Sequence, residues 1–184
     1  MERGSEVEVR IRSFRVEDAE AVHRWFNNRE AISSLMEVRD AFTLENARGW
    51  TAAAAAEEGE DRKFAIEVEG HEQPVGFTAL YGLFRQTAPE LGVLVADPPG
   101  AKGVGREAER QTAEKAFDEL GAHRVYGRIP ASNIPARKAV AWMGWQLEGT
   151  MPEHIRRADG TLIDCEIWGI TASGWRERWP RDDG

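Results

Sequence analysis

A glycine-rich turn near the middle of the chain has the composition of a phosphate-binding loop. It reads Gly100-Ala101-Lys102-Gly103-Val104-Gly105-Arg106 and joins a predicted strand, 90–95, to a predicted helix, 104–120. Glycine lets the backbone approach a bulky anion, and the free amides and dipole at a helix N-terminus favour phosphate. Gly103-x-Gly105 alone is more often a simple tight turn, and the segment is neither a Walker sequence nor a dinucleotide fingerprint. The turn is a candidate anion site, with Lys102 and Arg106 as its cations.

Hydrophobic periodicity places this turn within a series of strands and helices. The predicted strands are 7–11, 64–68, 75–83, 90–95, 124–129, 145–154 and 163–170, and the predicted helices are 17–28, 43–59, 104–120, 134–143 and 172–179. Helices between strands, together with hairpins, predict an α/β (α+β) fold with a mixed sheet. No internal repeat and no linker divides the chain, so we expect residues 1–184 to form one domain.

The charge of the chain argues against general nucleic-acid binding, since the net charge is −8. The acidic excess lies in the first half. Residues 1–100 carry 11 basic and 19 acidic side chains, and residues 101–184 carry 13 of each. An acidic half suits a cationic or amine-bearing substrate, but a solvated, soluble surface is the simpler interpretation.

Other composition features exclude several classes of protein. No apolar run approaches the roughly 18–20 residues that cross a membrane, and the first residues do not resemble a signal peptide. Cys165 is the one cysteine, so we expect no internal disulfide, a packed strand position for this residue, and a cytoplasmic protein. No His, Cys and Asp spacing predicts a metal site.

The order of these segments resembles the GNAT superfamily of acyl-CoA N-acyltransferases. It is most similar to the branch with the ribosomal-protein acetyltransferases RimJ and RimL and many amino-sugar and small-molecule acetyltransferases. The segments that carry the resemblance are Ile11–Glu20, Trp25-Phe26-Asn27-Asn28, Glu90-Leu91-Gly92, the glycine-rich turn, His123–Tyr126, Asn133–Lys138, Gly144–Gly149 and Gly174-Trp175. Each match is weak alone, but their order and spacing are specific. They cover nearly the whole chain.

This resemblance implies a fold and a reaction. The fold is a central mixed, mostly antiparallel sheet of six to seven strands flanked by about four helices. The reaction is transfer of an acyl group, usually acetyl, from acyl-CoA to a primary amine of a small molecule or a peptide N-terminus. The amine attacks the thioester directly, and strand amides stabilise the oxyanion. The implied donor is acetyl-CoA or another acyl-CoA, without a metal.

The resemblance also implies donor-binding residues. The strand 93–96 should present its backbone to the pantetheine arm and polarise the thioester carbonyl, and the turn should wrap the pyrophosphate. Asn133 should contact the pantetheine, and Arg137 could reach the phosphates or simply lie on an exposed helix face. The expected donor site is therefore Val93, Leu94, Val95, Ala96, Lys102, Gly103, Val104, Gly105, Arg106, Asn133 and Arg137.

The sequence departs from the family at positions that bear on catalysis. Gly100 stands where the family usually has Arg or Gln, so one donor contact is lost. Val140 and Ala136 stand where many relatives place a Tyr or a Ser, and neither can donate a proton. Water is one replacement for the missing proton donor. The candidate acid–base residues are Glu90, at the start of the donor strand, and Glu153 and His154, on a strand that borders the acceptor cleft in the family; a surface or structural role is the alternative for His154.

The acceptor site is less constrained. Trp25, Asn28 and Asp164 are candidate acceptor-binding residues, and Trp50 could line the same pocket. We expect the other tryptophans, Trp142, Trp145, Trp168 and Trp175, to pack in the core.

Two other functions are compatible with the same fold. One takes the acyl group from a carrier protein or an aminoacyl-tRNA, and the other is a non-catalytic acyl-CoA-binding module. A homodimer is possible in each case.

Overall fold

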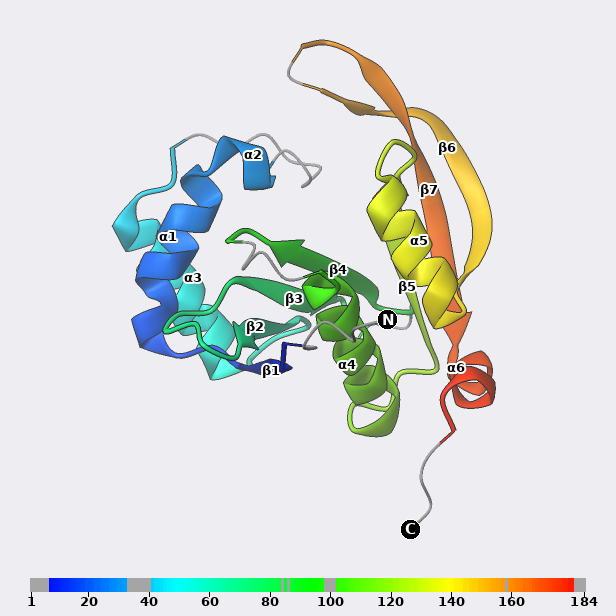
Figure 1. The fold of residues 1–184 in the computed structure, drawn as a ribbon, viewed down its shortest axis with the longest axis horizontal. Coiled ribbons are helices and arrows are strands. Elements are labelled where there is room, and N and C mark those ends of the chain that lie inside the picture. Colours follow the sequence, from blue (N-terminus) through cyan, green and yellow to red (C-terminus); the bar gives the residue numbers. More distant parts are fainter. Residues whose placement is uncertain are drawn as a thin grey trace, which may run out of the picture.

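Seven strands form one sheet in the order β1-β2-β3-β4-β5-β7-β6 (Figure 1). The structure is a computed structural model that describes residues 7–32, 41–83, 85, 87–97, 102–157 and 159–180. The strands are β1 (Val9–Ser13), β2 (Arg62–Val68), β3 (Gly76–Tyr81), β4 (Glu90–Val95), β5 (Arg124–Pro130), β6 (Gln146–Arg156) and β7 (Leu162–Thr171). Neighbouring strands are antiparallel except β4 and β5, which are parallel. The mixed, mostly antiparallel sheet is confirmed.

The helices lie between these strands as the periodicity predicts. They are η1 (Val16–Asp18), α1 (Ala19–Asn27), α2 (Arg29–Ile32), α3 (Leu44–Ala56), α4 (Val104–Asp118), α5 (Ile134–Met143) and α6 (Ala172–Arg178). Thr43 caps α3, because its Oγ1 accepts the amide of Asn46 at 3.1 Å. The short helix α2 was not expected, since the sequence predicted an end at Asn27-Asn28.

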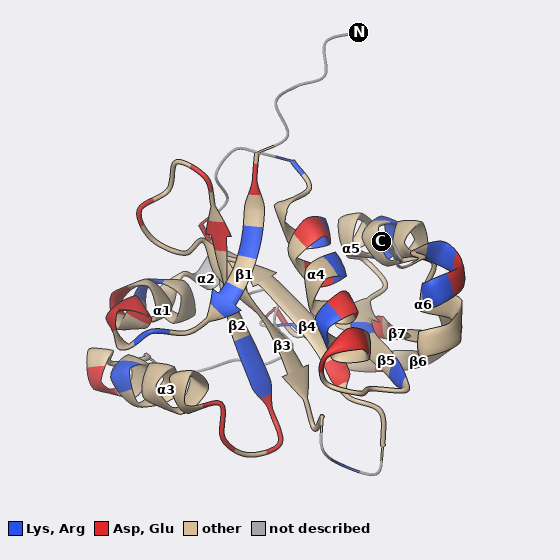
Figure 2. Cartoon of the chain, turned by 90° about the horizontal axis from the view of Figure 1, so that it is seen from below, with Lys and Arg blue, Asp and Glu red and all other residues tan. Residues whose placement is uncertain are grey.

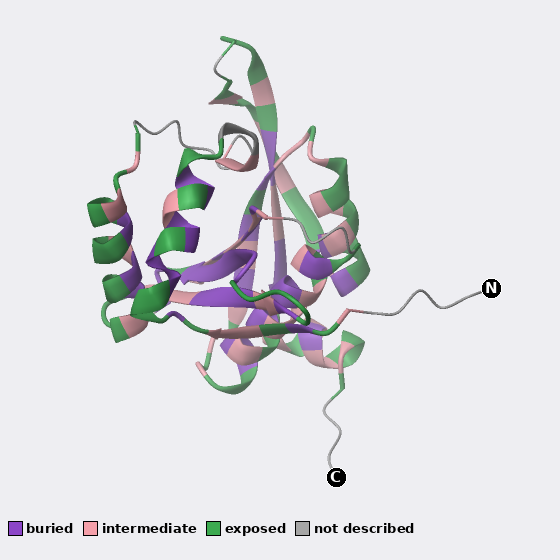
Figure 3. Ribbon diagram, turned by 60° about the vertical axis from the view of Figure 1, so that its left-hand side comes forward, coloured by how far each residue is buried: buried purple, intermediate pink, exposed green. Residues whose placement is uncertain are grey.

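Two layers of helix cover the sheet. On one face, Ala65, Phe77 and Leu94 pack with α1 and α3; on the other, Ile66 and Val75 pack with α4. This division follows from the period of two along each strand. Figure 3 shows helices with buried residues towards the sheet and exposed residues outside, and Figure 1 shows α5 beside β5 and β7.

The tryptophans divide between core and surface. Trp25, Trp145 and Trp175 are fully or almost fully buried. The core position expected for Trp142 is wrong: this residue is 40% exposed, and the guanidinium of Arg106 lies 4.3 Å from its ring centre. An indole face that attracts a cation tolerates a half-exposed position.

Two expectations from composition can be compared with the described residues. Cys165 is buried in β7, as expected, and burial raises the pKa of its thiol. None of the described helices is long and apolar enough to cross a membrane.

Candidate active site

The parallel strands β4 and β5 meet at one point and then separate. Their register holds one pair within the described residues, Glu90 with Tyr126, and the amide of Tyr126 donates to the Pro89 carbonyl at 3.2 Å. Figure 1 shows the two strands diverging beyond this pair. Beyond Glu90, therefore, the β5-facing backbone groups of β4 have no partner strand.

Two residues of β4 direct their backbone groups into that gap. The amide of Ala96 donates to the Val75 carbonyl at 2.9 Å, which makes Gly76 and Val95 a non-hydrogen-bonded pair of the β3–β4 ladder. In an antiparallel ladder the direction alternates along the strand. The backbone N–H and C=O groups of Val93 and Val95 therefore face away from β3, towards β5. A ligand in the gap can bind them as a strand would.

A cavity of about 890 Å³ occupies this gap and continues on both sides of the sheet. Gly92 and Leu94 line it from the face that carries α1 and α3, and Leu91 and Val93 line it from the face that carries α4. Residues of β5 and β6 and the first turn of α5 complete the wall. The cavity therefore passes through the sheet, so that one ligand can enter from each face.

The last residues of the glycine-rich turn form the start of α4, which begins at Val104. Gly103 caps the helix with φ of 90°, a conformation that glycine adopts without strain. Gly105 lies close to β4, since a Cβ there would be 3.3 Å from Val95 Cγ2. The amides of this first turn are available to an anion. Lys102 is exposed beside them, and Gly100 lies outside the described residues.

The two donor candidates on α5 have different surroundings. Asn133 caps the helix, accepting the amide of Ala136 at 3.2 Å, and also lines the cavity. Arg137 donates from Nε to Oε2 of buried Glu166 at 2.8 Å, and Trp168 Nε1 donates to the same oxygen at 2.8 Å. Arg137 thus joins α5 to β7, and its Nη1 donates to the Ala131 carbonyl at 3.3 Å.

The three candidate acid–base residues occupy different positions. Glu90 lines the cavity at the point where the strands separate, and Arg128 Nε donates to its Oε1 at 2.9 Å. His154 also lines the cavity, from β6, and is exposed. Glu153 does not line it: the residue has φ of 50°, at a shift of the β6–β7 register, and its amide donates to Asp164 Oδ1 at 2.9 Å. Asp164 thus holds the irregular backbone of β6.

Aromatic rings form the wall under α1 and α3. Phe26, Trp50 and Phe77 line the cavity, and their ring centres lie 5.4–6.1 Å apart. Trp25 lies behind this wall, where its Nε1 donates to Asp97 Oδ2 at 3.0 Å. Asn28 is exposed and accepts the amide of Ala31 at 3.3 Å, at the start of α2. Of the tryptophans considered for the acceptor, Trp50 is the one that contacts the cavity.

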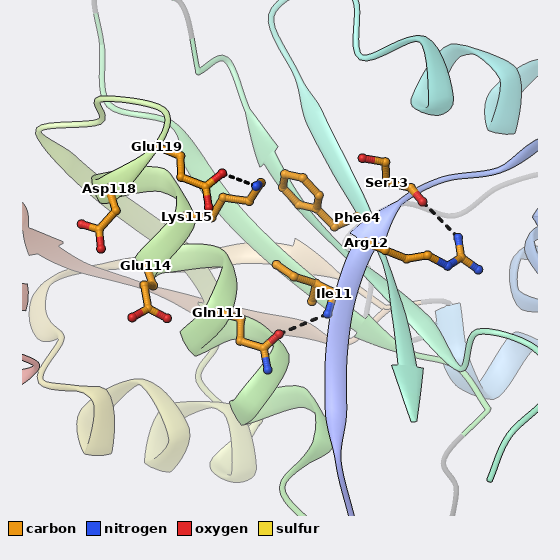
Figure 4. Close-up of a pocket in the computed structure, with 9 residues that line it drawn as sticks. All are labelled: Ile11, Arg12, Ser13, Phe64, Gln111, Glu114, Lys115, Asp118 and Glu119. Atoms are coloured by element: carbon orange, nitrogen blue, oxygen red, sulfur yellow. Dashed lines mark hydrogen bonds and ion pairs between the residues drawn. The ribbon is translucent and has the colours of Figure 1, made fainter. Parts of the chain in front are cut away.

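A second cavity, of about 540 Å³, lies between β1 and the second half of α4 (Figure 4). Gln111 bridges these elements: it accepts the amide of Ile11 at 3.1 Å and donates to the Val9 carbonyl at 2.8 Å. Each carboxylate on α4 here is ion-paired. Glu114 binds Arg110, Glu119 binds Lys115, and Asp118 binds Arg176. Figure 2 shows acidic and basic residues interspersed along α4. The polar side chains around this second cavity therefore make structural contacts.

Within the ranges that the structure describes, no group of three or more His, Cys, Asp or Glu side chains could hold a metal ion.

Comparison with known proteins assigns the family. A family model described as "Acetyltransferase (GNAT) domain" matches residues 8–146, well over half of the chain. The chain belongs to the GNAT family of N-acetyltransferases. The family and the fold that the sequence segments indicated are therefore confirmed.

Individual relatives of this GNAT protein are distant but cover most of it. The probable N-acetyltransferase YjcK of Bacillus subtilis (strain 168) is 24% identical over 170 residues, which are 88% of this chain and 93% of the relative. A spermidine N-acetyltransferase from Vibrio cholerae, solved with CoA and spermine, superposes with a TM-score of 0.80 at 19% identity, over 94% of this chain and 99% of that one. Mycobacterium smegmatis RimJ, solved with CoA-disulfide, has a TM-score of 0.75 at 22% identity, over 94% and 84%.

The lining of the cavity also contains residues that the sequence did not bring forward as site candidates. Lys63, Tyr81, Glu109 and Arg128 line the cavity. Lys63, Tyr81 and Arg128 lie on strands whose periodicity gave no sign of a shared cleft. Glu109 had a signal: it is a lone carboxylate on the apolar side of α4, four residues before Ala113 and eight before Phe117.

Proposed function

We propose that this protein transfers an acetyl group from acetyl-CoA to a primary amine of a small molecule or a peptide N-terminus. The observation that carries the proposal is the cavity between β4 and β5, which Val93 lines where β4 has no partner strand, together with the glycine-capped start of α4, where Gly105 lies against Val95. The CoA bound in the spermidine N-acetyltransferase and the CoA-disulfide bound in RimJ support a coenzyme A donor in this chain as well.

The donor would lie along β4. Its phosphates fit the first turn of α4, where backbone amides and the cations of Lys102 and Arg106 offset their charge. Its pantetheine arm fits the gap, since Val93 and Val95 offer amide and carbonyl groups there, and Asn133 borders the same space. A strand amide aimed at the thioester oxygen would stabilise the oxyanion that forms during attack.

The acceptor would enter from the face that carries α1 and α3. Glu90 projects to this face, and within the described residues its Oε2 has no donor in hydrogen-bond distance, while Oε1 is bound to Arg128. Oε2 can therefore accept a hydrogen bond from the attacking amine and orient it. Phe26, Trp50 and Phe77 favour an amine attached to an apolar group.

The test combines binding and turnover. Isothermal titration with acetyl-CoA should show one site per chain, and thiol release should be measured with a panel of amino-acid amides, short peptides and spermidine. Turnover with at least one amine is the expected result, and amines with an apolar substituent should be preferred. Absence of acetyl-CoA binding would refute the proposal. If turnover required a carrier-protein or aminoacyl-tRNA donor, that donor would replace acetyl-CoA in the proposal.

A further inference from the structure

Glu109 is a buried carboxyl group that the reaction described above does not use. It lies on α4, is 7% exposed and lines the cavity between β4 and β5. Among the described residues it has no hydrogen-bond or ion-pair partner. Burying a carboxyl group without a partner is unfavourable. A structural role alone therefore does not account for its presence on an otherwise apolar helix face.

No ion pair within the described residues joins Glu109 to a charged group on the surrounding elements, and burial is the one cause of its raised pKa. Those on β1, β5 and α5, which pack on α4, are Arg10, Arg12, Arg124, Arg128, Arg137 and Lys138, and those on its own helix are Arg106, Glu107, Arg110, Glu114, Lys115 and Asp118. The cavity adds Asp61, Lys63, Tyr81, Glu90, His154 and Arg156. Arg12, Arg124, Arg128 and Arg137 are bound to other carboxylates. Burial raises the pKa of Glu109 to about 8.

Glu109 and Glu90 approach the cavity from opposite faces of the sheet. Glu90 shares the face of β4 that carries α1 and α3, whereas Glu109 comes from α4, which covers the other face. The helix turn that fits the donor phosphates begins on this second face. Glu109 follows Val104 by five residues, about 7.5 Å along the helix axis. The donor arm would thus run beside Glu109, while the amine would approach from Glu90.

We propose that Glu109 is the catalytic acid that protonates the sulfur as it leaves the thioester, a role that rests on the proposed function. The amine nitrogen forms a bond to the carbonyl carbon, and the carbon–sulfur bond breaks. The sulfur takes the proton of the Glu109 carboxyl group, which becomes a carboxylate. The nitrogen releases its proton to water in the open cavity, and the carboxylate regains one from the same water. The products are the amide and a free thiol.

The first test is the pH profile of turnover. Glu109→Gln keeps the size of the side chain but cannot donate an acidic proton. We expect kcat at pH 7 to fall about 100-fold, with the KM for acetyl-CoA changed less than about threefold. In the wild type, kcat should fall above pH about 8, and this alkaline decline should be absent in the variant. Glu114→Gln, an exposed change on the same helix, is the matched control and should leave both parameters unchanged.

A second measurement does not depend on turnover. The thiol of bound CoA can be titrated by its ultraviolet absorbance. An ionised carboxylate beside the sulfur disfavours the thiolate, so this thiol should ionise at higher pH in the wild type than in Glu109→Gln.

Each outcome separates the two proposals. Equal thiol titrations, or an alkaline decline of kcat that persists in Glu109→Gln, would overturn the role of Glu109 and leave the acetyltransferase function intact. A rise in the KM for acetyl-CoA in Glu109→Gln, with kcat unchanged, would make Glu109 a donor-binding residue instead. If the wild type binds neither acetyl-CoA nor CoA, the proposed function and this inference fail together.

Discussion

Arg128 on β5 donates from Nε to Oε1 of Glu90 on β4, 2.9 Å away, at the point where the two strands separate. The pair fixes one carboxylate oxygen of a side chain that lines the cavity, and no hydrogen bond from the described residues reaches the other oxygen. If Oε2 orients the amine, Glu90→Gln should lower kcat/KM for the amine about 10- to 100-fold, the value of a hydrogen bond to a charged group. Steady-state kinetics with varied amine measure this, and an unchanged kcat/KM would remove Glu90 from the mechanism.

The ion pair between Arg137 and Glu166 should matter for stability. Arg137→Met leaves the buried Glu166 carboxylate without its cation, and we expect unfolding in urea to lose about 3 kcal/mol. The double variant Arg137→Met, Glu166→Gln should recover much of this loss. If Arg137 also contacts the donor phosphates, the double variant will bind CoA more weakly than the wild type although it is stable. Equal affinity would restrict Arg137 to its structural role.

Gly103 at the start of α4 should be sensitive to substitution. Its φ of 90° disfavours a side chain, so Gly103→Ala should cost about 1 kcal/mol of stability and displace the amides of the first helical turn. We expect weaker CoA binding by calorimetry. Gly160→Ala is the matched control, since its φ of 85° imposes similar strain in the β6–β7 turn, away from the cavity. Similar losses of CoA affinity in both variants would contradict a donor site at α4.

Trp50 and Trp142, neither of which is fully buried, should affect different substrates. Trp50→Leu shortens the aromatic wall of the cavity, and we expect the KM for the preferred amine to rise about tenfold while the KM for acetyl-CoA is unchanged. Trp142→Leu removes the ring against which Arg106 packs and should change the donor KM instead. Thermal unfolding checks that both variants are folded. If Trp50→Leu changed the KM for acetyl-CoA and Trp142→Leu the KM for the amine, the donor and acceptor sides of the cavity would have to be exchanged.

Stability should depend on pH through Glu109. Its pKa is raised from 4.5 to about 8, so the folded state binds its proton more tightly than the unfolded state does. This contribution is fully present below pH about 4.5 and is lost as pH rises towards 8. The loss is on the order of 5 kcal/mol as an upper bound, at about 1.4 kcal/mol for each unit of pKa difference. Urea unfolding of Glu109→Gln between pH 5 and 9 should lack this dependence, and Glu114→Gln should retain it.

The sequence predicted the elements of this fold because they are locally encoded. Alternation in Phe64, Ile66 and Val68 is sufficient for a strand, and the cap at Thr43 marks a helix start. The separation of β4 from β5 is not local. It depends on the parallel pairing of Glu90 with Tyr126, 36 residues apart in the chain, and neither strand carries a pattern for where the pairing stops.

The site was predictable to the same extent. Glu90 and His154, two of the candidate residues, line the cavity, while the glycines before α4 remain a prediction for the donor end. Periodicity could not separate Trp25 from Trp50, since both lie on apolar helix faces and one packs behind the other. Glu109 was included in the predicted helix, and its lone charge on the apolar stripe was the signal to follow.

The single rung between β4 and β5 has a mechanical consequence. The backbone ladders β1–β4 and β5–β7–β6 form two blocks, and beyond that rung they are linked by side chains and by α4. A donor arm bound along Val93 and Val95 would supply the missing hydrogen bonds and act as an eighth, removable strand. Binding and release of the donor in each catalytic cycle would then strengthen and weaken the contact between β4 and β5. Hydrogen exchange of the β4 amides should report whether the donor is bound.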